Sequence, residues 1–135
     1  MESSQNIVIY TDGGARGNPG PAGIGIVVKD AAGNLIKEWG SKIGVGTNNQ
    51  AEYTALIEAL KFVVTLKPHK VECRLDSELV VKQVRREYKV KDADLQKLFI
   101  KVWNLLQQIP KTSFVHIPRE RNKRADELVN QALDS

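Results

Sequence analysis

Four acidic residues that are far apart in the sequence share one kind of position, at the end of an expected strand or the start of an expected helix. They are Asp12, Glu52, Asp76 and Asp126. Asp12 and Asp76 follow runs typical of β-strands, whereas Glu52 and Asp126 fall in the first turns of expected helices. If the two strands are neighbours in one sheet, the four carboxylates meet at its edge.

A carboxylate cluster of this kind predicts a site for divalent cations. Like charges at short range repel one another or raise carboxyl pKa values, and a bound cation relieves both effects. Carboxylate oxygens with no thiolate and at most one imidazole favour Mg²⁺ or Mn²⁺ over zinc. A partly filled coordination shell leaves positions for water and phosphate, which suits phosphoryl transfer.

Taken singly, each of these carboxylates is better explained by a structural role. Asp12 can be a turn residue, Glu52 the partner of a helix cap, and Asp76 an anion at a helix start. Asp126 can pair with the neighbouring Arg121 or Arg124. The agreement of four such positions with one expected sheet edge is what favours a functional site.

The first half of the chain predicts three strands and a helix. Residues 7–10 form a strand that ends at Asp12, and residues 23–30 and 35–43 form two more, connected too closely for crossovers and therefore antiparallel. Apolar residues three and four apart predict a helix over residues 49–66. Asn49 and Glu52 stand at the spacing of a capping box, with Asn49 as the cap.

The second half completes a mixed sheet. A strand over residues 70–75 follows the first helix and so predicts a parallel crossover, after which Ser77 can cap a short helix. A longer amphipathic helix ends before Pro110, a strand covers residues 112–117, and a last helix runs over residues 122–133. The order βββαβααβα predicts an α/β fold with a mixed five-stranded sheet flanked by helices, in one domain over residues 1–135.

Composition narrows the class of protein. The 135 residues are 41% hydrophobic and 27% charged, which excludes a disordered chain and a membrane protein. The formal charge of +4 is a modest basic excess of the kind expected for a protein that binds nucleic acid, although a solvated basic surface explains it equally well.

Cys73 is the only cysteine, so no intramolecular disulfide can form. Without a signal peptide or an apolar span, we expect a cytoplasmic location.

Four sequence motifs resemble the type 1 ribonuclease H family. They are YTDGGARGNPGPAG at residues 10–23, TNNQAEY at 47–53, LDS at 75–77, and HIPRERN at 116–122 followed by Ala125 and Asp126. The resemblance covers nearly the whole chain, and the motifs occur in the family's order. The segment 86–94 is short, whereas some bacterial members carry a long basic handle containing Trp at this place. The chain therefore resembles the branch of the family without a handle.

The resemblance implies an enzyme with a defined reaction. Members are endonucleases that hydrolyse the RNA strand of an RNA/DNA hybrid with two Mg²⁺ or Mn²⁺ ions, leaving 5′-phosphate and 3′-hydroxyl ends. Asp12, Glu52, Asp76 and Asp126 correspond to the family's metal-binding catalytic carboxylates. His116 corresponds to a histidine on a mobile loop that assists proton transfer or product departure, and without the resemblance it is simply a strand-end histidine.

Substrate contacts are implied by the same motifs. The residues concerned are Gly13, Gly14, Ala15, Asn18, Thr47, Asn48, Asn49, Gln50 and Asn122. Discrimination of RNA from DNA requires contacts to 2′-hydroxyls across the shallow minor groove, which backbone groups and amides of this kind can make. A smaller set of basic residues can contact phosphates or can be a solvated helix face: Lys82, Arg85, Arg86, Lys89 and Lys91.

Two alternatives to a free-standing ribonuclease remain open. A related fold member can act on other nucleic acids, as the ribonuclease H domain excised from a reverse transcriptase or as a junction resolvase. A noncatalytic module that binds RNA/DNA hybrid without cutting it is the alternative from another class. For every one of these we expect a nucleic-acid partner, no membrane and no protein partner, with a monomer as the default.

Overall fold

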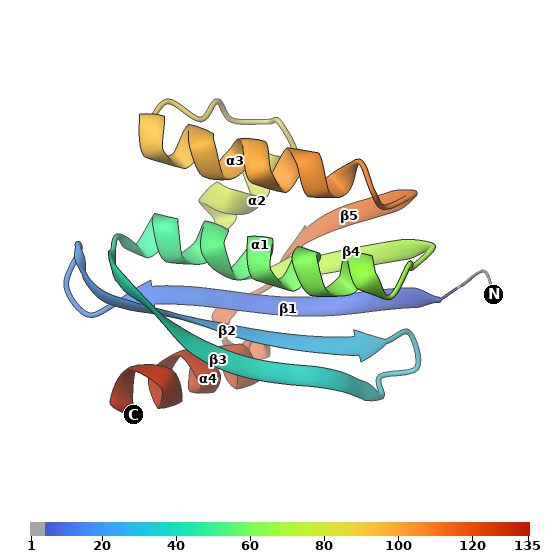
Figure 1. Ribbon diagram of the computed structural model, residues 1–135, viewed down its shortest axis with the longest axis horizontal. Coiled ribbons are helices and arrows are strands. Elements are labelled where there is room, and N and C mark those ends of the chain that lie inside the picture. Colours follow the sequence, from blue (N-terminus) through green and yellow to red (C-terminus); the bar gives the residue numbers. More distant parts are fainter. Residues whose placement is uncertain (1–4) are drawn as a thin grey trace.

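The computed structural model describes residues 5–135 as one mixed sheet with helices on both faces (Figure 1). The strand order is β3-β2-β1-β4-β5, so the predicted α/β class and five-stranded sheet are confirmed. The strands are β1 (Asn6–Ala15), β2 (Gly20–Asp30), β3 (Leu35–Gly46), β4 (Lys70–Leu75) and β5 (Lys111–His116). The helices are α1 (Asn48–Thr65), α2 (Glu78–Val84), α3 (Ala93–Leu106) and α4 (Lys123–Asp134), with a short 3₁₀ turn at Arg119–Arg121.

The central strand β1 joins the two halves of the sheet. It pairs antiparallel with β2 and parallel with β4, as the short and long connections predicted. The prediction that this strand ends at Asp12 is wrong, because the hairpin ladder continues to the pair Ala15 and Ala22. Asp12 therefore lies within the strand, opposite Gly25, where the sheet fixes its backbone.

The helices divide between the two faces of the sheet. Figure 1 shows α1, α2 and α3 on one face and α4 on the other, where it packs on β2 and β3. The core between the sheet and α1 holds Ile9, Ile26, Leu56, Leu60 and Val63, each fully buried. Burial of these side chains is the dominant stabilising contribution and fixes α1 across β1.

The start of α1 differs from the prediction. The cap is Thr47, whose Oγ1 accepts from the Gln50 amide at 3.1 Å, while Gln50 Oε1 accepts from the Thr47 amide at 2.9 Å. The prediction of a capping box formed by Asn49 and Glu52 is therefore wrong. The helix begins one residue earlier, and Thr47 supplies the short hydroxyl that reaches the third helical amide. Glu52 therefore takes no part in the helix cap.

Helix α4 reaches the sheet closely because β2 carries a glycine beneath it. A Cβ on Gly25 would lie 2.0 Å from the Ala125 carbonyl oxygen, far inside van der Waals contact. This approach places the first turn of α4 beside Asp12. Within residues 5–135, no helix combines the length and apolar character needed to cross a membrane.

Candidate active site

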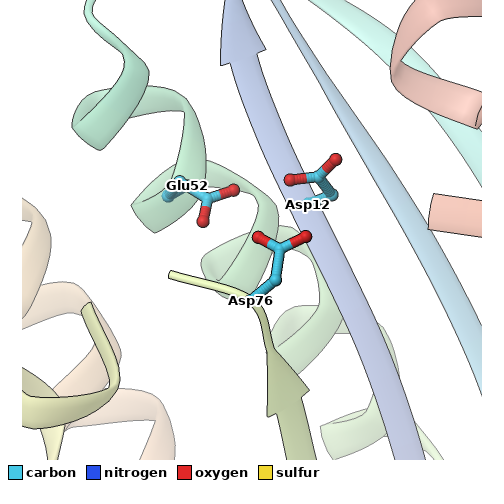
Figure 2. A group of neighbouring side chains, drawn as sticks. All are labelled: Asp12, Glu52 and Asp76. Carbon is cyan, nitrogen blue, oxygen red and sulfur yellow. The ribbon is translucent and has the colours of Figure 1, made fainter. Parts of the chain in front are cut away.

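Three carboxylates from three elements converge at one point. One carboxylate oxygen from each of Asp12, Glu52 and Asp76 lies within 4.8 Å of the other two. Figure 2 shows them approaching from β1, from α1 and from the end of β4. Glu52 is 7% exposed and Asp12 9% exposed, so these two carboxylates are largely withdrawn from water, while Asp76 is half-buried. All three were expected at one sheet edge from the sequence.

Gly13 allows α1 to approach β1 closely, so that Glu52 lies beside Asp12. A Cβ at this position would lie 2.2 Å from the carbonyl carbon of Ala51, so any larger residue would hold α1 away from β1. The Gly13 amide donates to Glu52 Oε1 at 2.5 Å and to Asp12 Oδ1 at 3.0 Å. One backbone amide thus orients two of the three carboxylates.

Burial raises the pKa of all three carboxyl groups, and neighbouring carboxylates add to the rise. Burial raises the pKa of Asp12 to about 7, opposed by a hydrogen bond with Glu52 and assisted by the charges of Asp76 and Asp126. Burial, followed by the neighbouring Asp12, raises the pKa of Glu52 well above its ordinary value. Burial also raises the pKa of Asp76, although the amide of Asn122 opposes it. The ionised cluster is therefore costly without a cation.

Asp126 lies beside these three residues rather than among them. It occupies the first turn of α4, and a hydrogen bond to its carboxyl group contributes to the raised pKa of Asp12. Its other contact is Arg119 Nη2 at 3.9 Å from Oδ1, a long and largely exposed pair. Asp126 therefore lies next to Asp12 but outside the group of three carboxylates whose oxygens lie within 4.8 Å of one another.

These carboxylates open into a cleft of about 530 Å³. Its lining includes nine residues predicted from the sequence, namely Asp12, Gly13, Gly14, Ala15, Asn48, Asn49, Glu52, Asp76 and Asp126. It also includes Arg16, Ser77, Arg119 and Asn130, which the sequence reasoning missed. Arg16 and Arg119 stand inside the quoted motifs, and Asn130 is four residues after Asp126, so helical spacing could have indicated it.

Asn18 and Asn48 fasten the β1–β2 turn to the start of α1. The Asn48 amide donates to Asn18 Oδ1 at 3.0 Å, and the Ala15 amide donates to Asn48 Oδ1 at 2.9 Å. Asn18, Thr47 and Gln50 do not line the cleft, and the last two bind each other in the helix cap. The structure thus gives these three residues structural partners beside the substrate role that the motifs imply.

Asn122 and His116 approach Asp76 from the segment before α4. Asn122 is 1% exposed, and its Nδ2 donates to the Thr11 carbonyl at 2.8 Å and to Asp76 Oδ2 at 3.2 Å. Its place is behind the carboxylate rather than on the cleft wall. His116 ends β5 opposite Leu75, is exposed, and lies close enough for its charge to lower the pKa of Asp76.

The residues present fit a divalent metal. The donor set consists of carboxylate oxygens, which hard cations such as Mg²⁺ and Mn²⁺ prefer. Burial and the neighbouring carboxylates raise the pKa of Asp12 and Glu52, and a bound divalent cation would favour their ionised forms. Fold and site together present a carboxylate centre at the edge of a mixed α/β sheet, an arrangement that can hold metal ions.

Comparison with known proteins identifies the family. A family model described as "Reverse transcriptase-like" matches residues 10–132. The ribonuclease HI of Halobacterium salinarum is 44% identical to this chain, and the match covers 93% of this chain and 63% of the relative. The crystal structure of RNase H1 from the same organism superposes with a TM-score of 0.93 at 43% identity. That superposition covers 96% of this chain and 98% of the other. LC11-RNase H1, isolated from compost, gives a TM-score of 0.91 at 52% identity in a complex with RNA/DNA hybrid, covering 95% and 96%.

The chain belongs to the ribonuclease H family, with type 1 enzymes among its relatives. It spans about 63% of the Halobacterium protein and 36% of a bifunctional protein of Mycobacterium tuberculosis to which it is 43% identical over 96% of the present chain. In the latter relative, the matching region is therefore one part of a longer protein.

Proposed function

We propose that this chain is an endonuclease that hydrolyses the RNA strand of RNA/DNA hybrids with two divalent metal ions. The observation that carries the proposal is the convergence of Asp12, Glu52 and Asp76 within 4.8 Å at the floor of an open cleft. The hybrid-bound structure of the 52% identical LC11-RNase H1 supports the choice of substrate.

The carboxylates have distinct parts in this proposal. Mg²⁺ or Mn²⁺ ions, when bound, would supply the positive charge that activates water and stabilises the leaving oxygen. Asp12 and Asp76 project from adjacent parallel strands and would hold the ions from the sheet, while Glu52 would hold them from α1. Asp126 would complete the set on the α4 side.

The walls of the cleft would position the hybrid. Gly14, Ala15, Asn48 and Asn49 present backbone groups and amides beside the carboxylates, where ribose 2′-hydroxyls can be recognised. Arg119 is 83% exposed in its side chain and faces the same cleft, so its guanidinium can bind a phosphate of the substrate strand. His116, exposed beside Asp76, would give or take a proton as the strand is cut and the 5′-phosphate product departs.

The test is cleavage of an end-labelled RNA/DNA hybrid beside duplex DNA, duplex RNA and single-stranded RNA. Each substrate is incubated with Mg²⁺, with Mn²⁺ and with a chelator. Cutting of the hybrid alone, in the presence of metal alone, with 5′-phosphate products, supports the proposal. A hybrid that is bound but left intact would instead identify a noncatalytic binding module, and equal cutting of all four substrates would refute the assigned substrate.

A further inference from the structure

A second depression lies on the α4 face of the sheet, away from the cleft. Its larger part, about 330 Å³, is lined by Tyr10, Glu72, Arg74, Val115, Ile117 and Arg121. An adjoining part of about 130 Å³ is lined by Tyr10, Val27, Lys29, Arg121, Asn122, Arg124 and Ala125. Tyr10 and Arg121 are common to both parts, so we call the whole the Tyr10 depression.

The strand register accounts for this grouping. Tyr10 pairs with Arg74, and Arg74 pairs with Val115, so these three side chains point to the same face in one row across β1, β4 and β5. Helix α4 packs chiefly on β2 and β3, so it leaves this row partly exposed, with Tyr10 and Arg74 half-buried. Val115 is 36% exposed as a result.

Positive charge is in excess here. Arg74 binds Glu72 at 2.6 Å, and Arg124 binds Glu38 at 2.6 Å, so two of the four cations are neutralised. Lys29 and Arg121 form no ion pair with any carboxylate in the described part of the chain. Lys29 instead lies 5.5 Å from the centre of the Tyr10 ring, and its charge lowers the pKa of Glu38 from a distance.

Hydrogen-bond donors are in excess as well. The Tyr10 hydroxyl accepts from Arg74 Nη1 at 2.6 Å, and within residues 5–135 its own proton has no acceptor. Arg121 donates through its side chain to none of the described residues. Val115 and Ile117 form an apolar wall next to these donors. The depression therefore offers unpaired cations and donors on one side and an apolar surface on the other.

We propose that the Tyr10 depression binds a phosphate monoester of nucleotide size. A phosphate monoester carries about −1.5 to −2 charge near neutral pH and accepts hydrogen bonds through three oxygens, which matches Arg121, Lys29 and the Tyr10 hydroxyl. A volume of about 330 Å³ is at the small end of ligand sites, so one nucleoside unit against Val115 and Ile117 fills it. The source of the monoester is a free mononucleotide or the 5′-phosphorylated end of an oligonucleotide.

The first experiment is calorimetric titration of the full chain with adenosine 5′-monophosphate in the presence of a chelator. Without divalent metal no hybrid is cleaved, and any binding of phosphate at Arg16 or Arg119 in the cleft would be unaffected by a change at Arg121, so the two sites are distinguished. We expect saturable binding of one equivalent, weakened about tenfold in Arg121→Gln, since a charge-assisted hydrogen bond contributes roughly 1.5 kcal/mol. Lys97→Gln, which removes an exposed cation on α3 that lines neither the cleft nor the depression, is the control and should bind as the native chain does.

The second experiment distinguishes the sources. A short single-stranded oligoribonucleotide is titrated with and without its 5′-phosphate, beside adenosine and inorganic phosphate. Preference for the phosphorylated oligonucleotide over adenosine monophosphate assigns the depression to strand ends, and equal affinities assign it to the monoester alone. The proposal is overturned if adenosine monophosphate shows no saturable binding, if adenosine binds equally well, or if Arg121→Gln and Lys29→Gln leave the affinity unchanged.

Discussion

The side-chain amide of Asn122 donates to the carboxylate of Asp76 at 3.2 Å from a position that is 1% exposed to solvent. The same nitrogen donates to the Thr11 carbonyl at 2.8 Å. Asn122 thereby connects the start of α4 to β1 and to the end of β4, and it sets the orientation of a carboxylate without lining the cleft. The motifs implied a substrate contact at this residue, whereas its position supports a role in orienting Asp76.

Replacement of Asn122 by Ala should therefore impair both stability and activity. Loss of the two hydrogen bonds leaves the buried Thr11 carbonyl without this donor, which costs about 1–3 kcal/mol in the free energy of unfolding. We expect a lower kcat with little change in KM for the hybrid, because the substrate surface is kept. Urea denaturation and steady-state kinetics measure the two effects, and a rise in KM with kcat unchanged would contradict the orienting role.

Asp76→Asn should abolish hybrid cleavage while the fold persists. The change removes a charge from the carboxylate cluster with almost no change in volume, and a lost electrostatic contact of this kind costs about a hundredfold or more in kcat. Asp94→Asn, an exposed acid in the first turn of α3, is the control and should cut at the native rate. Native activity in Asp76→Asn would refute the site.

The raised carboxyl pKa values predict an unusual dependence of stability on pH. Asp12 has a folded pKa of about 7 against an ordinary value of 3.8, so the folded state binds the proton more tightly than the unfolded chain. This contribution is complete below about pH 4 and is lost as the pH rises through 7, so stability in chelator should fall over that window. Glu52, whose pKa is also raised, acts in the same direction.

Urea denaturation at pH 5 and pH 8, in chelator and then with Mg²⁺, measures this effect. Mg²⁺ should restore stability at the higher pH, because a bound cation favours the ionised cluster. Asp12→Asn should show a weaker pH dependence in chelator than the native chain. Stability that rises from pH 5 to pH 8 in the native chain, and equally in Asp12→Asn, would show that the cluster does not carry the predicted repulsion.

Gly13→Ala should destabilise the fold, whereas Gly14→Ala should be tolerated. The added Cβ at Gly13 would lie 2.2 Å from the Ala51 carbonyl carbon, while at Gly14 it would meet only a Val129 methyl at 4.0 Å. Forcing α1 away from β1 costs about 1–3 kcal/mol or more and moves Glu52 out of the cluster. Thermal unfolding of the two variants tests the contrast, and equal melting temperatures would contradict it.

His116→Ala should slow turnover without stopping it. A positioned acid or base contributes about 10²- to 10⁴-fold at most, and the carboxylate cluster would keep its metal ions in the variant. We expect multiple-turnover rates to fall by more than the binding of hybrid does. Complete loss of cleavage in a folded His116→Ala protein would show that the histidine is indispensable rather than auxiliary.

Local pattern was enough to predict the strands, the helices and their order. Alternation of buried and exposed residues marks β4, and three- and four-residue spacing marks α1, because both periods follow from backbone geometry. The antiparallel and parallel pairings followed from connection length alone. The candidate carboxylates were identified in the same way, since Asp76 ends a recognisable strand and Glu52 begins a recognisable helix.

Details that depend on a partner far away in sequence were not predictable. Thr47 rather than Asn49 caps α1, because the geometry of the incoming chain decides which short polar side chain reaches the free amides. Asp12 lies within β1 and not at its end, because β2 extends the ladder to Ala15. Arg119 and Asn130 line the cleft because α4 sits against the sheet, which its own sequence does not specify.

The sequence by itself determined the kinds of element, their order and the acidic residues available for chemistry. Only the tertiary structure decided that Asp12, Glu52 and Asp76 meet within 4.8 Å and that Asn122 supports Asp76 from behind. The physical reason is that secondary structure responds to neighbours along the chain, whereas the distance between carboxylates depends on how closely elements pack. At Gly13 that packing depends on the absence of a single carbon atom.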